Sequence, residues 1–220
     1  MDRLPSLRHF VLRAAALLWL ALAPALALAG AQVEERLAPS VVAGLARSIA
    51  DNPVPADYAN RADVTLWVNE MSRRLAGRID DALYRREFLS TVHYEATRAG
   101  LDPTLVLGVI HHESGFKKYA VSVASARGYM QVMPFWSRLI GSPDHNLFNL
   151  RTNLRYGCVI LRYYLDTESG DYFRALGRYN GSLGRAEYPN AVLGAASRYR
   201  FDVPALGTPT VMTTSGAAAR

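Results

Sequence analysis

Two residue types are scarce in this sequence, which has a single cysteine, Cys158, and only two lysines, the adjacent pair Lys117 and Lys118. One cysteine cannot form an internal disulfide, so we expect Cys158 to be buried and structural. The remaining positive charges are arginines spread along the chain, and no run of basic residues supports binding of nucleic acid. The formal net charge of +6 suits an anionic polymer or a membrane surface as a partner.

The N-terminal apolar run, residues 14–28, is shorter than the about 20 residues that a membrane-spanning helix needs. Basic residues up to Arg13 precede this run, and it ends in the small-residue site Ala27-Leu28-Ala29. The pattern is typical of a secretory signal over residues 1–29, cleaved after Ala29, and predicts an exported, periplasmic protein. A retained N-terminal anchor fits the length of the run less well.

The rest of the chain divides into three parts. Residues 30–84 carry amphipathic patterns without a chemical motif and are predicted to be a helical N-terminal extension. Residues 85–203 hold all the motifs described below and are predicted to be the functional domain. Residues 204–220 are rich in Thr, Ala, Gly and Pro, which predicts a disordered tail.

Hydrophobic periodicity and capping residues predict a mainly α-helical fold. Residues 120–126 are small or β-branched, and they predict one small β-hairpin lobe beside the helices. The helix predicted from Pro103 has Asp102 as its N-cap and Pro103 at its first helical position. The predicted helices cover residues 40–51, 63–75, 85–99, 103–113, 130–140 with its start near Pro134, 149–165, 171–179 and 188–199.

An acidic residue, Glu113, lies at the end of the helix predicted from Pro103. Glu113 follows Val106 by seven residues and Ile110 by three, so the three side chains share one helix face. A Ser-Gly pair then ends the helix, which puts the carboxylate at the negative end of the helix dipole. Burial and the dipole both raise the pKa of the carboxyl group, as a general acid requires. By position alone, a buried glutamate in a salt bridge is an equal alternative.

Four separated motifs follow one another between residues 85 and 202. In this order they resemble the motifs of the goose-lysozyme-like catalytic domain of the soluble lytic transglycosylase family. The resemblance implies a lysozyme-like α+β fold. The motifs are Glu-Ser-Gly-Phe at 113–116, Ala-Val-Ser at 120–122 with Gly-Tyr-Met-Gln-Val-Met-Pro at 128–134, Asn-Leu-Arg-Tyr-Gly at 153–157, and Arg-Tyr-Asn-Gly at 178–181.

The resemblance implies a lytic transglycosylase that cleaves the β-1,4 bond between N-acetylmuramic acid and N-acetylglucosamine in peptidoglycan without water. Glu113 matches the family's single catalytic glutamate, which protonates the glycosidic oxygen and then deprotonates the muramic C6 hydroxyl to leave a 1,6-anhydromuramic end. Ordinary glycosidases need two carboxylates. The later acids of this chain are expected to be surface charges or helix caps, namely Asp144, Asp166, Glu168, Asp171 and Glu187.

The same resemblance implies several substrate-binding residues around the catalytic acid. Ser114 is implied to hold the carboxylate or a sugar substituent, and Met130 and Gln131 are implied to lie along the glycan groove. Tyr179 matches the tyrosine that hydrogen-bonds the catalytic glutamate, and Asn180 matches a residue on the muramic side of the site. A helix cap, a loop residue or a buried aromatic is the ordinary structural alternative for each.

Three positions depart from the family's pattern. Tyr129 replaces the usual Leu and adds a ring beside the groove, so we include it among the substrate-binding residues, where it can stack on a sugar or narrow a subsite. Ser125 stands where Gly is usual, so the loop must adjust if that position needs a positive φ. Arg178 replaces Ala, and it either favours anionic peptide stems or is simply solvated.

The run His111-His112-Glu113 does not predict a metal site. Neighbouring positions on a helix point about 100° apart, and the His-Glu-x-x-His spacing of a zinc site is absent. We therefore expect no metal and no cofactor.

The expected partner is the glycan strand of peptidoglycan, and proteins of the cell envelope or of a secretion machinery remain open as further partners. Two other functions fit the same motifs. One is a lysozyme-type muramidase that uses water, and the other is a catalytically silent glycan-binding or secretion-system scaffold. The retention of Glu113, Gln131, Tyr179 and Asn180 speaks against the scaffold.

Overall fold

The structure is a computed structural model that describes residues 32–50 and 54–202, and within these ranges it contains no β-strand. The prediction of a mainly helical fold is confirmed, and each predicted helix is present with small shifts of its bounds. No helix in the described part is long and apolar enough to cross a membrane. The predicted signal and tail lie outside the described residues. The helices are α2 (Pro39–Ile49), η1 (Tyr58–Asn60), α3 (Ala62–Arg74), α4 (Ala82–Arg98), α5 (Pro103–Glu113), α6 (Pro134–Ile140), α7 (Leu150–Thr167), α8 (Tyr172–Asn180) and α9 (Glu187–Ser197).

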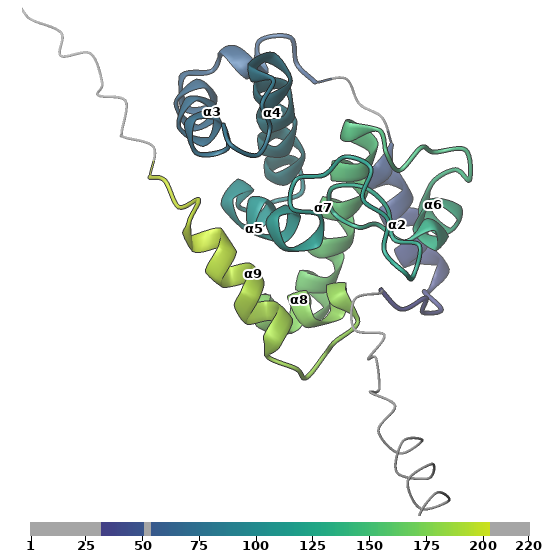
Figure 1. Ribbon diagram of the computed structural model, residues 1–220. Coiled ribbons are helices and arrows are strands. Elements are labelled where there is room, and N and C mark those ends of the chain that lie inside the picture. Colours follow the sequence, from purple (N-terminus) through teal and green to yellow (C-terminus); the bar gives the residue numbers. More distant parts are fainter. Residues whose placement is uncertain (1–31, 51–53, 203–220) are drawn as a thin grey trace, which may run out of the picture.

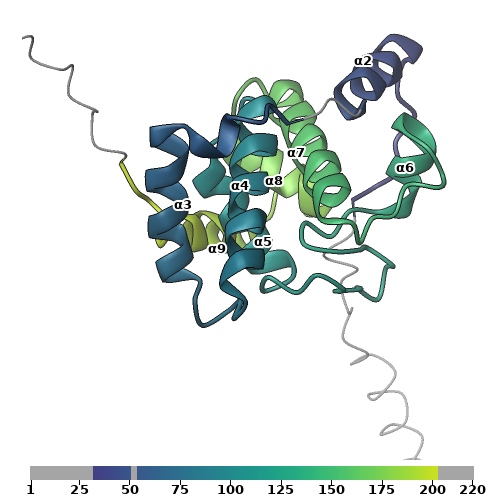
Figure 2. The same ribbon diagram turned by 90° about the horizontal axis from the view of Figure 1, so that it is seen from above.

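Helix α7 is the centre of the fold. Twelve of its 18 residues are buried, among them Cys158 as predicted, and a helix that is buried almost all round must be covered on every side. Helices α4 and α8 pack against α7 on one side and α2 packs on the other, where it also contacts α6. Figures 1 and 2 both show α7 between these groups.

Helix α5 is buried from Leu105 to Ile110 and packs mainly against α9. Its start is as predicted, because the Asp102 carboxylate accepts a hydrogen bond from the Thr104 amide at 2.8 Å. Gly108 allows the close packing of the two helices. A Cβ atom there would lie 2.7 Å from the Ala196 Cβ and 2.8 Å from the Val192 carbonyl oxygen. This packing brings the end of α5 to the start of α9.

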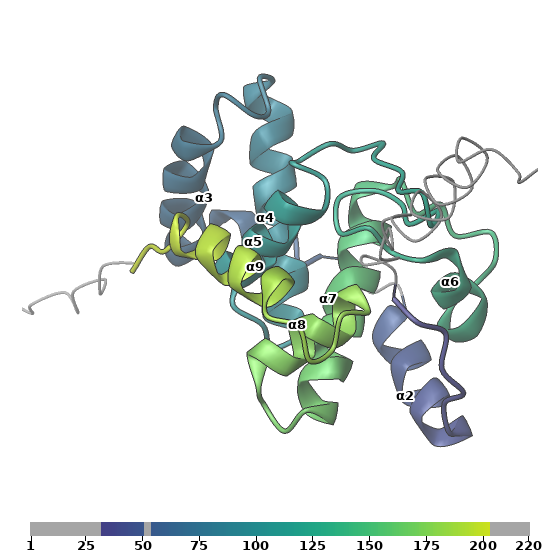
Figure 3. The same cartoon turned by 60° about the horizontal axis from the view of Figure 1, so that its bottom comes forward.

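The N-terminal segment packs on the rest of the described chain through two helices. Helix α3 lies against α4, and α2 lies against α6 and α7 (Figure 3). Gln32 is only 5% exposed, and its side-chain oxygen accepts a hydrogen bond from the Met133 amide at 3.3 Å. The predicted division of the chain at residue 85 falls inside α4, which begins at Ala82.

The expected β-hairpin at residues 120–126 is not formed. In its place, the described chain makes two isolated antiparallel bridges, both through Arg127. The backbone turns at Ser125, Gly128 and Gln131, whose φ angles are 69°, 74° and 49°. Positive φ is incompatible with extended strands, so each bridge ends before a ladder can form.

The positive φ of Ser125 explains why this position usually favours glycine, and it gives a stability prediction. A non-glycine residue in the left-handed region costs about 1–2 kcal/mol, whereas glycine costs about 0.5–1 kcal/mol in backbone entropy. We therefore expect Ser125→Gly to stabilise the protein by about 0.5–1 kcal/mol and to raise the Tm by about 2 °C in thermal unfolding.

Ser122 provides the control for this prediction. It has no positive φ, and its hydroxyl accepts a hydrogen bond from the Ala126 amide at 3.1 Å. Ser122→Gly is therefore expected to lower the Tm. A Tm for Ser125→Gly at or below that of the unchanged protein contradicts the prediction.

Candidate active site

Glu113 is the last residue of α5, and Ser114 is the C-cap. Glu113 is partly exposed, whereas residues 105–110 of the same helix are buried. Burial raises the pKa of the Glu113 carboxyl group to about 7. Both the protonated and the ionised forms are therefore populated near neutral pH, which allows one group to give and to accept a proton.

The partner of this carboxyl group is Tyr188, at the start of α9. Its hydroxyl donates a hydrogen bond to the Glu113 Oε1 atom at 2.5 Å, and this bond lowers the Glu113 pKa against the effect of burial. Tyr188 is buried, and its ring packs edge-on to the His112 ring at 4.9 Å. Burial also raises the pKa of Tyr188 well above its usual range, so the hydroxyl remains a donor.

Tyr179 does not make the hydrogen bond that the family resemblance implied. Its buried hydroxyl donates to the Met130 carbonyl oxygen at 2.7 Å, so the prediction that it hydrogen-bonds Glu113 is wrong. Tyr179 is nevertheless close to the acid, because the Glu113 charge adds to the effect of burial in raising the Tyr179 pKa. Sequence reasoning missed Tyr188, which belongs to no motif that we identified.

Three other predicted site residues hold the loop and the helix end in place. The Ser114 hydroxyl donates to the Ile110 carbonyl oxygen at 3.1 Å and so caps α5. The Met130 amide donates to the Asn153 side-chain oxygen at 2.8 Å, and Met130 is fully buried. The Gln131 side-chain nitrogen donates to two carbonyl oxygens of its own loop, those of Ala120 at 3.1 Å and Gly128 at 2.9 Å.

Asn180 differs from these residues. It is the last residue of α8, and Gly181 follows with a φ of 74°. Within the described part of the chain, the Asn180 side-chain amide has no hydrogen-bond partner, although the residue is only 8% exposed. The Asn180 amide atoms are not among the buried polar atoms without a partner in the described residues, so water or a ligand can reach them. Of the predicted binding residues, Asn180 is the one with a polar group available for a ligand.

Tyr129 lies in the core instead of beside a groove. It is 2% exposed, its ring centroid lies 4.8 Å from that of Phe88, and its hydroxyl hydrogen-bonds that of Tyr84 at 2.8 Å. The prediction that Tyr129 stacks on a sugar or narrows a subsite is therefore wrong. The substitution of Leu by Tyr is accommodated because α4 offers both an aromatic surface and a hydroxyl partner.

Arg178 is partly exposed and is held by two acidic side chains. It pairs with Glu168 and lies 3.5 Å from the Glu35 carboxylate. Glu168 also pairs with Arg174 and is only 9% exposed, so it is not a solvated surface charge, but it is the C-cap of α7, as the alternative of a helix cap predicted. Asp171 is the N-cap of α8, as predicted.

The two histidines before Glu113 point to different neighbours. The His111 Nδ1 atom hydrogen-bonds the Tyr199 hydroxyl at 2.6 Å, whereas the exposed His112 packs on Tyr188. In the part of the chain that the structure describes, no cluster of three His, Cys, Asp or Glu side chains is arranged to hold a metal ion.

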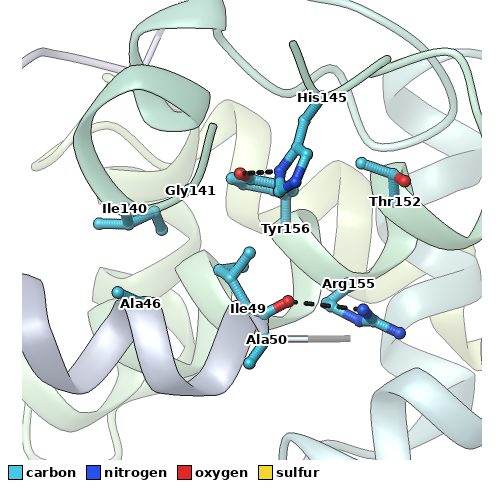
Figure 4. A pocket seen from close by; sticks show the side chains of 9 residues that line it. All are labelled: Ala46, Ile49, Ala50, Ile140, Gly141, His145, Thr152, Arg155 and Tyr156. Atoms are coloured by element: carbon cyan, nitrogen blue, oxygen red, sulfur yellow. Dashed lines mark hydrogen bonds between the residues drawn. The ribbon is translucent and has the colours of Figure 1, made fainter. Parts of the chain in front are cut away.

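A pocket lies apart from these residues, between α2, α6 and α7 (Figure 4). There the His145 Nδ1 atom hydrogen-bonds the Tyr156 hydroxyl at 2.7 Å, and Arg155 reaches the Ile49 carbonyl oxygen at 3.4 Å. None of the residues that line this pocket belongs to the Glu113 site.

Comparison with known proteins finds relatives that share part of this chain. Membrane-bound lytic murein transglycosylase C of Actinobacillus pleuropneumoniae serotype 5b is 36% identical over 103 residues, which are 43% of this chain and 28% of the relative. The protein of the same name from Haemophilus influenzae strain PittEE is 45% identical over 118 residues, or 45% of this chain and 32% of the relative. The chain thus matches about a third of the length of these relatives or less.

A solved structure of an inactive mutant of the lytic transglycosylase Slt from Pseudomonas aeruginosa is 21% identical to the chain. The match covers 78% of this chain and 38% of the Slt chain, with a TM-score of 0.46. The transglycosylase SLT domain family matches residues 90–197, which run from α4 to the end of α9 and include both Glu113 and Tyr188. Residues 90–197 of the chain thus match the transglycosylase SLT domain family.

Proposed function

We propose that this protein is a peptidoglycan lytic transglycosylase with Glu113 as its single acid and base. The observation that carries the proposal is the Glu113 carboxyl group itself, partly exposed at the end of α5 and with a pKa of about 7. The match of residues 90–197 to the SLT domain family and the names of the relatives support the same activity.

The proposed reaction needs one protein group that changes its protonation state twice. Protonated Glu113 gives its proton to the glycosidic oxygen as the bond from C1 of N-acetylmuramic acid to that oxygen breaks. The Glu113 carboxylate then takes the proton of the muramic C6 hydroxyl, and O6 forms a bond with C1. The products are a 1,6-anhydromuramic end and a free N-acetylglucosamine hydroxyl, and no water is consumed.

The electrostatic surroundings of Glu113 support a mechanism with one carboxylate. Retaining glycosidases hold their two carboxylates about 5–5.5 Å apart, and a like charge within about 4–6 Å raises the pKa of a carboxyl group. Among the described residues, no charged group shifts the Glu113 pKa. Burial raises the pKa and only the Tyr188 hydroxyl lowers it.

We also propose the surroundings in which this activity takes place. The signal-like pattern of residues 1–29 supports export to the periplasm, where peptidoglycan lies. We assign the catalytic role to residues 85–203 and a supporting role to residues 30–84, whose helices α2 and α3 pack on α7 and α4. Ser114, Met130, Gln131 and Tyr179 act by holding the site together, and Asn180 binds the sugar with its open amide.

Mass spectrometry of the muropeptides released from purified sacculi tests the proposed function. We expect products with 1,6-anhydromuramic ends, which are one water lighter than reducing ends. Reducing ends instead indicate a muramidase that uses water and contradict the proposal. Release of no muropeptide at all, equal to that of a Glu113→Gln control, indicates a catalytically silent scaffold.

A further inference from the structure

The loop that follows Glu113 carries exposed apolar side chains that the proposed chemistry does not use. Tyr119 is 71% exposed, Val121 is 60% exposed and Val123 is fully exposed. Large apolar side chains that gather on one surface usually mark a binding site. Nothing in the described part of the chain covers this loop.

Aromatic and basic side chains meet at this loop. The Tyr119 ring centroid lies 5.8 Å from that of Phe148, two residues before α7. The Lys118 ammonium nitrogen lies 5.4 Å from the Tyr119 ring centroid, and the Arg127 guanidinium carbon lies 5.9 Å from that of Phe148. We call these four residues, Lys118, Tyr119, Arg127 and Phe148, the Tyr119 platform.

The positive charges of Lys118 and Arg127 have no acidic neighbour in the sequence, because residues 114–143 contain no Asp or Glu. An exposed ring flanked by cations suits a ligand that has both an apolar face and negative charges. A glycan strand with peptide stems has both, since one face of a sugar ring presents C–H groups and the stems carry carboxylates. Tyrosine and arginine are also the residues that most often dominate binding energy at interfaces.

The platform is close to the proposed site of cleavage. Tyr119 follows Glu113 by six residues, so their Cα atoms are at most about 20 Å apart. The loop is tied to the 128–134 motif, because the Gln131 side chain donates to the Ala120 carbonyl oxygen and the Gly128 amide donates to the same oxygen at 2.9 Å. A strand bound across Glu113 can therefore extend onto the platform.

We propose that the Tyr119 platform is a second binding site for the peptidoglycan strand, outside the bond that is cut. The Tyr119 ring binds a sugar face, and Lys118 and Arg127 bind the carboxylates of peptide stems. This proposal rests on the proposed function, because it takes the ligand to be the substrate of Glu113.

Cosedimentation with purified sacculi, using the chain with Glu113→Gln to prevent turnover, tests the platform. We expect Tyr119→Ala in this background to weaken binding about tenfold, the effect of a moderate interface hot spot. With active Glu113, the same change is expected to raise KM on sacculi and to leave kcat unchanged, because binding at the platform is equal before and during reaction. Tyr172→Ala is the control, since Tyr172 is an exposed tyrosine of α8 outside the platform.

Binding to glycan strands whose peptide stems an amidase has removed tests the aromatic contact to the sugar separately from the charged contacts to the stems. Arg127→Gln is expected to weaken binding to strands with stems and to leave binding to bare strands unchanged, whereas Tyr119→Ala weakens both. Unchanged binding of Tyr119→Ala to sacculi overturns the platform. If Tyr119→Ala weakens binding to phosphatidylglycerol vesicles but not to sacculi, the platform binds a membrane surface instead, and the proposal is also overturned.

These outcomes are distinct from a failure of the proposed function. If the unchanged protein releases no anhydromuropeptides but its binding to sacculi still depends on Tyr119, the platform stands and the proposed activity fails. If it releases them and Tyr119→Ala binds normally, the activity stands and the platform fails.

Discussion

Replacing Glu113 by Gln is expected to lower kcat on sacculi by about 10²- to 10⁴-fold, the usual contribution of general acid–base catalysis. The amide keeps the size of the side chain, and its oxygen can still accept the Tyr188 hydrogen bond. It can neither give a proton to the glycosidic oxygen nor take one from the C6 hydroxyl. Release of anhydromuropeptides over time, measured by liquid chromatography, gives the rate.

The same variant tests the burial of the carboxyl group without reference to activity. Because the Glu113 pKa in the folded protein is about 7 against an ordinary 4.5, the folded state holds this proton more tightly than the unfolded state. Stability is therefore lost as pH rises from about 4.5 through 7. Each pKa unit is worth about 1.4 kcal/mol, so we expect Glu113→Gln to be more stable than the unchanged protein by about 3 kcal/mol at pH 8 and about equally stable at pH 4.

The matched control is Glu187→Gln, which removes an exposed acid beside Tyr188. Its activity and its stability are expected to stay close to those of the unchanged protein at both pH values. Activity of Glu113→Gln within a few-fold of normal, with stable protein, contradicts the assignment of Glu113 as acid and base.

The helical spacing that predicts burial of Glu113 also fits Glu95. Only the structure shows that the two carboxyl groups have different partners. Glu95 follows Phe88 by seven residues and Val92 by three, so it too shares an apolar helix face. It is 1% exposed and pairs with arginines of α4 and α7, Arg98 at 3.0 Å, Arg151 at 3.5 Å and Arg155 at 3.1 Å. Spacing predicts burial of an acid, but not whether a cation from another helix meets it.

The helices and their caps follow from local sequence because neighbouring residues determine them. Asp102 and Pro103 are enough to begin α5, and Asp171 is enough to begin α8. The partners of Tyr129 and Tyr179 depend on which side chains distant segments bring close. Tyr129 meets Tyr84 of α4, and Tyr179 meets the Met130 carbonyl oxygen, which no periodic pattern encodes.

Tyr188→Phe is expected to move the alkaline limb of the kcat/KM pH profile upward by about one unit. Its hydroxyl lowers the Glu113 pKa by donating to the carboxylate, and a hydrogen bond to a charged group is worth about 1.5–3 kcal/mol. Without it, the Glu113 pKa rises further above 7, so the protonated acid persists to higher pH. We also expect kcat at pH 7 to fall about tenfold, because the carboxyl group loses the contact that orients it.

Tyr179→Phe tests whether the shift of the alkaline limb is specific to the Tyr188 hydroxyl or follows from the loss of any buried tyrosine hydroxyl at the site. Its hydroxyl donates to the Met130 carbonyl oxygen, so its loss is expected to lower stability by about 1–3 kcal/mol through an unsatisfied buried group. It leaves the hydrogen bond between Tyr188 and Glu113 intact, and the alkaline limb is expected to stay in place. If Tyr179→Phe moves the limb and Tyr188→Phe does not, Tyr179 is the partner of Glu113 in the working enzyme, as the family resemblance first implied. If only Tyr188→Phe shifts the alkaline limb, the Tyr188 hydroxyl at the start of α9 sets the pKa of Glu113.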